Sequence, residues 1–238
     1  KKKFSKKLMD GLMPCPEYFP SNVHLNKNGY ENVEEIIKKS YNPLSSSEFE
    51  YLSKKNCIIL DVRSKFDFSC SHIPKSLFIG LEGNFAPWVG SVIGDIKTPI
   101  LLVTDKNKEK ETIKRLARVG FDNILGYLSD GIEGWVISGR EIDSINNVSA
   151  DEIFTKPLKI FDVRTPAEYF KKHVKSSINL PLNNYKKNKV KTSSNNPFYV
   201  HCQSGYRSLI YLSILKKSGI HSGLNVKGGF KSIEKLSN

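Results

Sequence analysis

Cysteine is scarce in this chain, and its spacing argues against two classes of site. The four cysteines are Cys15, Cys57, Cys70 and Cys202. They are too few and too scattered for a disulfide framework, and no C-x-x-C pair suggests a zinc site or a dithiol redox centre. The pattern favours a reducing, cytoplasmic location.

Long apolar runs are also missing. No run reaches the roughly 18 apolar residues that a membrane span needs, so we predict no membrane association. The Lys-rich start KKKFSKKLMD is not followed by the apolar core of a signal peptide. Because the chain begins at Lys1 and not at a methionine, we expect further residues upstream in the natural protein.

Acidic residues are outnumbered, 24 against 37 basic ones, which gives a formal net charge of +13. Such an excess suggests a nucleic-acid surface. However, the lysines are spread over the chain, and only the first seven residues form a basic block. No base-reading motif accompanies them, so we predict no nucleic-acid partner and interpret the charge as a solvated surface that suits an anionic small substrate.

The chain contains an internal repeat. IILDVRSKFDFSCSHIPKSLFI, from Ile58, and KIFDVRTPAEYFKKHVKSSINL, from Lys159, align at one offset. The matched pairs are Asp61/Asp162, Val62/Val163, Arg63/Arg164, Asp67/Glu168 and His72/His173. Each copy is about the size of one small domain. We therefore divide the chain into a lead-in or linker at 1–43, a first domain at 44–143 and a second domain at 144–238.

Short β-rich apolar runs alternate with helical patterns in each copy, which predicts an α/β fold with a small, mostly parallel sheet flanked by helices. In the second copy the predicted strands are Lys159–Val163, Ser177–Leu180, Phe198–His201 and Gly223–Val226. The helix after Arg207 should end before Gly219. The lead-in reads as irregular, with a short helix near Val33–Lys39.

The stretch VHCQSGYRS, Val200 to Ser208, suggests a reactive cysteine. A strand should end at His201, the loop CQSGYR should follow, and a helix should start at Arg207 or Ser208. Backbone N–H groups converge where a loop enters a helix, and the helix dipole adds positive charge, so a thiol there ionises more readily. Gly205 lets the loop curl, and Arg207 adds a fixed charge.

The simpler alternative makes Cys202 a small packing residue at the end of a strand. The first copy argues against this interpretation, because it departs from the pattern in this segment. It has Asp105 in place of the cysteine, and its segment from strand to helix-ending glycine is two residues shorter. We expect Asp105 to cap the following helix and the first domain to be non-catalytic.

These residues resemble the rhodanese family of sulfurtransferases as a tandem pair. In the second copy the resemblance rests on FDVRTPAEY, His173–Val174, VHCQSGYRS and the GGF at Gly228–Phe230. It implies that Cys202 accepts a sulfane sulfur as a persulfide and that Arg207 and Ser204 contact an anionic donor. An acceptor such as sulfite, cyanide or a thiol then removes the sulfur. No metal or organic cofactor is implied. The implied substrate-binding loop comprises Gln203, Ser204, Gly205, Tyr206 and Ser208.

Two further stretches, GLMPCPEYFPSNVHLNKNGY (Gly11–Tyr30) and GLEGNFAPWVG (Gly80–Gly90), are similar to the C-terminal part of certain bacterial fusions. In those fusions a metallo-β-lactamase-fold persulfide dioxygenase precedes two rhodanese domains, the first without its cysteine. This resemblance implies an upstream iron-dependent dioxygenase domain in the same polypeptide. The five histidines of the chain have no metal-ligand spacing, so we predict no metal site within it. One departure from the family is Lys172–His173–Val174, where Gly-His-Ile is common.

Several neighbouring residues have competing interpretations. Asp162, Arg164 and Glu168 could form an acid–base group, but the first copy keeps their equivalents without a nucleophile, so we favour structural roles. His201 could serve as a base, yet adjacent strand residues point to opposite faces. The patch around Trp88 could cover the first domain's core or face the second domain. Cys15 reads as an incidental exposed cysteine.

Three functional classes remain open from the sequence. The favoured class is a sulfurtransferase acting on thiosulfate or a low-molecular-weight persulfide. A phosphatase or arsenate reductase is less favoured, because relatives with such loops have five residues between cysteine and arginine and this chain has four. The third class is a non-catalytic docking module. The physiological donor and acceptor, the direction of the reaction and the formation of a homo-oligomer stay open.

Overall fold

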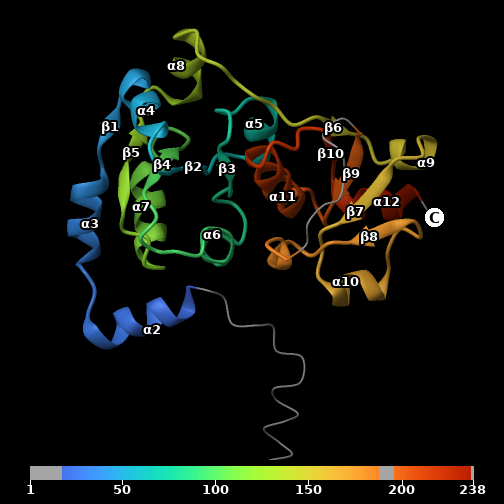
Figure 1. The fold of residues 1–238 in the computed structure, drawn as a ribbon, viewed down its shortest axis with the longest axis horizontal. Helices are drawn as coiled ribbons and strands as arrows, with labels where there is room; N and C mark the ends of the chain where they lie inside the picture. The colour runs from blue at the N-terminus through green and yellow to red at the C-terminus, as the bar shows by residue number, and fades with distance from the viewer. Residues whose placement is uncertain (1–17, 188–195, 237–238) are drawn as a thin grey trace, which may run out of the picture.

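The computed structural model describes residues 18–187 and 196–236. They form two α/β units that follow one another along the chain, with the first at the left and the second at the right of Figure 1. Cys15 and the first seven residues of the stretch Gly11–Tyr30 lie outside the described residues.

Each unit is built on one five-stranded, fully parallel sheet. The first sheet has the order β1-β5-β4-β2-β3 and the second the order β6-β10-β9-β7-β8. The first set of strands is β1 (Pro43–Leu44), β2 (Ile58–Asp61), β3 (Leu77–Phe78), β4 (Ile100–Val103) and β5 (Ile124–Leu128). The second set is β6 (Asn147–Val148), β7 (Lys159–Asp162), β8 (Ser177–Asn179), β9 (Phe198–His201) and β10 (Gly223–Val226). The two orders are the same when each unit is counted from its own first strand, as the sequence repeat predicts.

Helices cover both sheets, which confirms the predicted fold class. The first unit contains α3 (Val33–Ser40), α4 (Ser46–Ser53), α5 (Lys65–Cys70), α6 (Phe85–Ile93), α7 (Glu109–Ala117) and α8 (Gly131–Ile137). The second contains α9 (Glu152–Thr155), α10 (Pro166–Lys171), the 3-10 turn η1 (Leu182–Asn184), α11 (Tyr206–Lys217) and α12 (Gly229–Leu236). In the described part of the chain no helix combines the length and apolarity needed to cross a bilayer.

The lead-in is more ordered than the sequence predicts. A helix, α2 (Phe19–Asn28), precedes α3, where an irregular segment was expected. Pro20 lies in its first turn, a position that tolerates proline because no hydrogen bond is lost there. The ring of Tyr18 is buried and lies so close to Gly90 of α6 that a Cβ there would be 2.1 Å from it. The proline therefore marks the start of a helix.

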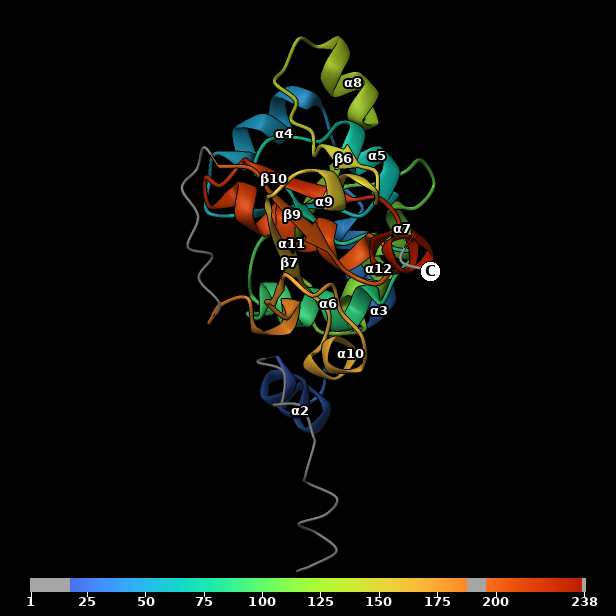
Figure 2. The same cartoon turned by 90° about the vertical axis from the view of Figure 1, so that its right-hand side faces the viewer.

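One apolar cluster spans the two units, and each unit has a further cluster of its own. Phe78 and Val89 of the first unit belong to the same buried cluster as Phe161 and Tyr211 of the second. Helix α11 lies between the two sheets, and the Ser213 hydroxyl accepts a 3.1 Å hydrogen bond from the Phe78 amide. Figure 2, turned by 90°, shows the second unit in front of the first. A shared apolar interface fixes the relative orientation of two domains more firmly than a polar one.

The predicted boundaries at 43/44 and 143/144 stay predictions. In the structure the first boundary divides strand β1, because Pro43 lies before it and Leu44 after it. The second boundary falls in the connection between α8 and β6. Asp143, in this connection, forms a 2.8 Å ion pair with Lys216 of α11.

Candidate active site

Cys202 follows β9 directly and is held by the loop that leads into α11. The Gly205 N–H donates a 3.1 Å hydrogen bond to its Sγ. Gly205 has φ +93°, a conformation that residues with a Cβ rarely adopt, and α11 begins at the next residue. The helix starts at Tyr206, one residue before the predicted start, so Tyr206 and Arg207 belong to its first turn. A backbone donor and a helix N-terminus therefore meet at the thiol.

The thiol is enclosed and still borders a cavity. Only 1% of Cys202 is exposed, and part of the residue packs against the shared apolar core. It also lines a cavity of about 710 Å³ together with Ser204, Tyr206 and Arg207. The Ser208 hydroxyl lies 3.6 Å from Sγ and donates at 2.7 Å to Asn225 Oδ1. The site thus places the thiol beside a cavity, with the Gly205 N–H and the Ser208 hydroxyl close to Sγ.

Arg207 is committed to a carboxylate. Its Nη1 and Nη2 donate to the two oxygens of Glu168 at 2.7 and 2.6 Å. Glu168 also accepts from the amide and hydroxyl of Thr165 at the start of α10, which completes a capping box. The bond from Arg207 leads the causes that lower the pKa of Glu168 to about 2, against the opposing effect of burial. Glu168 therefore has a structural role, as favoured from the sequence, through the cap of α10 and the pair with Arg207.

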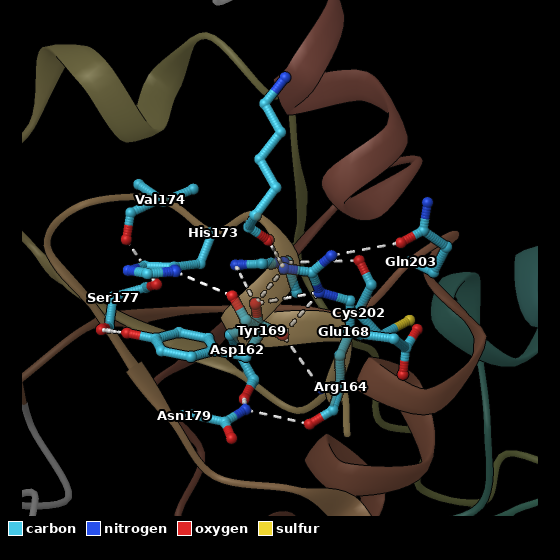
Figure 3. A network of polar contacts seen from close by, with 12 residues as sticks. Asp162, Arg164, Glu168, Tyr169, His173, Val174, Ser177, Asn179, Cys202 and Gln203 are labelled. Atoms are coloured by element: carbon cyan, nitrogen blue, oxygen red, sulfur yellow. Dashed lines mark hydrogen bonds and ion pairs between the residues drawn. The ribbon is translucent and has the colours of Figure 1, made fainter. Parts of the chain in front are cut away.

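Asp162 and Arg164 form a separate, fully buried pair at the end of β7. Arg164 Nη2 donates to Asp162 Oδ2 at 2.7 Å and to the Lys172 carbonyl at 2.8 Å (Figure 3). Its guanidinium lies 3.8 Å from the centre of the Phe230 ring. The first unit repeats the pair as Asp61 and Arg63 at 2.6 Å. A geometry present in both units, one of which has Asp105 in place of the loop cysteine, fits bracing of the turn after the strand.

His201, His173 and His72 form contacts with groups other than the Cys202 thiol. His201 is buried with Nε2 3.7 Å from Asp162 Oδ2, on the far side of its strand from the Cys202 side chain. Burial lowers its pKa, with the charge of Asp162 acting in the opposite direction. His173 and His72 stack on Tyr169 and Phe68 and share a hydrogen bond with the carbonyls of the same residues, at 2.8 and 2.7 Å.

The predicted substrate-binding residues divide into two groups. Ser204 and Tyr206 line the cavity with Cys202 and Arg207. Gln203 turns toward Arg164, whose Nη1 donates to its Oε1 at 3.4 Å (Figure 3), and Ser208 is buried inside α11. Gly205 acts through its backbone. The sequence therefore located the loop, while the structure determines which side chains face the cavity.

The first unit has a different arrangement at the equivalent position. Asp105 is exposed, and α7 begins only at Glu109, with no side-chain cap. The expectation that Asp105 caps this helix is wrong, because the intervening residues form a turn before the helix starts. Partial desolvation of its carboxyl group, followed by the negative charge of Asp67, raises the pKa of Asp105.

The sequence did not identify the contribution of the first unit to the cavity. Six of its lining residues are Lys65, Phe78, Gly80, Glu82, Gly83 and Trp88. The Tyr206 hydroxyl donates to the Gly80 carbonyl at 2.8 Å, and Lys65 Nζ donates to the Ser204 carbonyl at 3.1 Å. Phe85 is buried in the core, whereas Trp88 lies at the cavity, so the patch around Trp88 serves both expected roles.

One sequence signal could have pointed to Lys65. It lies where the repeat copies diverge, opposite Pro166 of the second copy, so it is not part of the shared framework. Gly80, Glu82 and Gly83 differ from their counterparts in the second copy as well, but contacts between domains leave no local periodicity that marks a cavity. Within residues 18–187 and 196–236, no group of three or more His, Cys, Asp or Glu side chains could hold a metal ion.

A family model described as "Rhodanese-like domain" matches residues 46–138 and 148–236. Among curated proteins, the chain is 36% identical over 73 residues to "Uncharacterized protein YqhL" of Bacillus subtilis (strain 168), covering 31% of this chain and 58% of that protein. It is 30% identical over 120 residues to "Putative sulfur carrier protein YrkF" of the same organism, covering 44% of this chain and 65% of the relative. The chain thus spans less than two thirds of either relative.

Among solved structures, the thiosulfate sulfurtransferase from Pseudomonas aeruginosa is similar at 16% identity with a TM-score of 0.36. The match covers 83% of this chain and 43% of that structure. A likeness this weak supports no functional inference.

Proposed function

This chain belongs to the family of proteins with rhodanese-like domains, and from that premise we propose that it is a sulfurtransferase. It moves a sulfane sulfur from thiosulfate or a low-molecular-weight persulfide to sulfite, cyanide or a thiol. The observation that carries the proposal is the Gly205 N–H donating to Cys202 Sγ beside a cavity. A hydrogen bond from a backbone amide stabilises a thiolate and, after transfer, a persulfide anion.

The proposed reaction has two displacement steps at sulfur. The Cys202 thiolate attacks the outer sulfur of thiosulfate, the bond between the two donor sulfurs breaks, and sulfite leaves with the electron pair of that bond. Cys202 then carries a persulfide anion in the loop formed by residues 202–207. An acceptor such as cyanide attacks the terminal sulfur and leaves as thiocyanate, which returns the thiolate. Charge balances in each step, and no external oxidant or reductant is needed.

Each part of the site has a role in this proposal. The loop amides and the first turn of α11 stabilise the anionic sulfur. The low exposure of Cys202 limits attack to small compounds and protects the persulfide from bulk solvent. The first unit, with Asp105 at the equivalent position, supplies part of the cavity wall and no nucleophile.

We further propose, from the sequence resemblance, that the natural polypeptide carries an upstream persulfide dioxygenase domain that generates or consumes the sulfur compounds used here. A reducing, cytoplasmic location also stays a prediction.

The function is tested by comparing cysteine variants in a thiosulfate-to-cyanide transfer assay. Cys202→Ser should abolish thiocyanate formation, because a hydroxyl cannot form the persulfide. Cys57→Ser and Cys70→Ser are the matched controls and should retain most of the activity, since neither lines this cavity. A Cys202→Ser protein with the full rate would refute the proposal. An inactive wild-type protein would favour a docking module.

A further inference from the structure

The charged residues that line the Cys202 cavity are unequally neutralised. They are Arg63, Lys65, Glu82 and Arg207. Arg63 is paired with buried Asp61 at 2.6 Å, and Arg207 with Glu168 through two hydrogen bonds. A guanidinium held by a carboxylate contributes little net field at a distance. Two of the three cations in the lining are therefore largely cancelled.

Lys65 differs from both arginines. It is the first residue of α5 in the first unit, which lacks the loop cysteine, and its side chain extends to the second unit. Its Nζ donates at 3.1 Å to the Ser204 carbonyl, a neutral group, and within the described part of the chain it forms no ion pair. An ammonium has three donors, so two remain for a ligand. This Nζ is held against the same loop that carries the thiol, two residues along the chain from Cys202.

We propose that Lys65, supplied by the first domain, is the cation that binds the anionic group of the sulfur donor. This inference rests on the proposed function and assigns the donor-binding charge to a residue outside the catalytic repeat. In the first displacement step the ammonium holds the sulfonate end of thiosulfate and then the departing sulfite. The bond to the Ser204 carbonyl sets its position relative to the thiol.

Glu82 determines the sign of the charge that remains in the cavity without Lys65. It is exposed in the same lining, and among the cations of that lining Lys65 alone is left to offset it, because Arg63 and Arg207 are bound to carboxylates. Replacing Lys65 with a neutral residue leaves a cavity whose unpaired lining charge is negative, so a dianion is repelled instead of attracted. A donor with a single negative charge feels half of that change. The effect should therefore scale with donor charge.

The kinetic test compares Lys65→Met with wild type on thiosulfate, a dianion, and on methanethiosulfonate, a monoanion. KM for thiosulfate should rise about 5- to 20-fold, between the effect of an exposed ion pair and that of a charged hydrogen bond. KM for the monoanion should rise less, and kcat should stay within about twofold, because the ammonium binds donor charge without reacting. Lys65→Arg should restore most of the thiosulfate KM. Lys38→Met, on the exposed face of α3, is the matched control.

An unchanged KM in Lys65→Met would overturn the inference. A fall in kcat with unchanged KM would overturn it as well, because that result makes Lys65 only a clamp on the Ser204 loop.

A binding measurement separates the inference from the proposed function. Thiosulfate is titrated calorimetrically into Cys202→Ser and into the double variant Cys202→Ser/Lys65→Met, neither of which can turn over. Weaker binding by the double variant, about 5- to 20-fold, supports the assignment of Lys65 even if the wild-type protein transfers no sulfur. Equal binding by the two proteins refutes the assignment even if the wild-type protein is active.

Discussion

At Cys202 the chain places a thiol against the amide of Gly205 and next to a helix start, and this local geometry was predictable from nine residues. The partner of Arg207 was not. Its bond to Glu168 joins two residues far apart in the sequence, and nothing in the spacing of either motif indicates it. Residue types therefore predicted where the thiol lies, whereas the charge balance of the cavity depends on a contact between distant residues.

The pairing of Arg207 with Glu168 makes a directional prediction at the residue scale. Glu168→Gln removes the carboxylate charge but keeps the capping box, which accepts glutamine at this position. Arg207 then adds net positive charge to the cavity, so KM for thiosulfate should fall about 3- to 10-fold. Steady-state kinetics check this, with Glu152→Gln on α9 as a control distant from the cavity. A raised KM in Glu168→Gln would show that orientation of Arg207 matters more than its charge.

At the scale of elements, the repeat and the apolar runs predicted the longer strands closely. The runs at Phe198–His201 and Gly223–Val226 are strands β9 and β10 as expected. Strands β1 and β6 were missed because two residues are too short to show alternation. Helix α2 was missed because proline and Asn-Gly were read as turn signals. Local sequence patterns therefore predict only those helices and strands that are long enough to show a hydrophobic period.

The fit between Gly83 and Tyr206 can be tested at this scale. A Cβ on Gly83 would lie 2.2 Å from the Tyr206 ring, so Gly83→Ala must displace the first turn of α11 or the loop before α6. We expect a loss of about 1–3 kcal/mol of unfolding free energy, the usual cost of overpacking. Urea unfolding measures it. Gly83→Ala/Tyr206→Leu should be less destabilised than the sum of the single variants. Strict additivity would mean that the two residues do not meet.

At the scale of the whole molecule, the two repeats are joined by one buried apolar cluster. The shared cluster joins β3 and α6 of the first unit to α11 of the second, and polar contacts such as Tyr185 Oη to the Val92 carbonyl, at 2.7 Å, reinforce it. The sequence predicted two domains but not this union, because apolar residues at an interface have the same periodicity as those of a domain's own core.

Unfolding of the full chain should therefore be cooperative. We expect a single calorimetric transition, with calorimetric and van't Hoff enthalpies in agreement, because separating the units exposes buried residues of both. Two resolved transitions would contradict a shared core. In that case the first unit would be a neighbour of the site and not part of it.

Sulfur transfer through Cys202 is the central claim, and intact-protein mass spectrometry with peptide mapping tests it most directly. After incubation with thiosulfate, the protein should gain the mass of one sulfur atom on the peptide that contains Cys202, and cyanide should remove it. A protein that gains no mass, or gains it only on the peptides of Cys57 or Cys70, would contradict the claim.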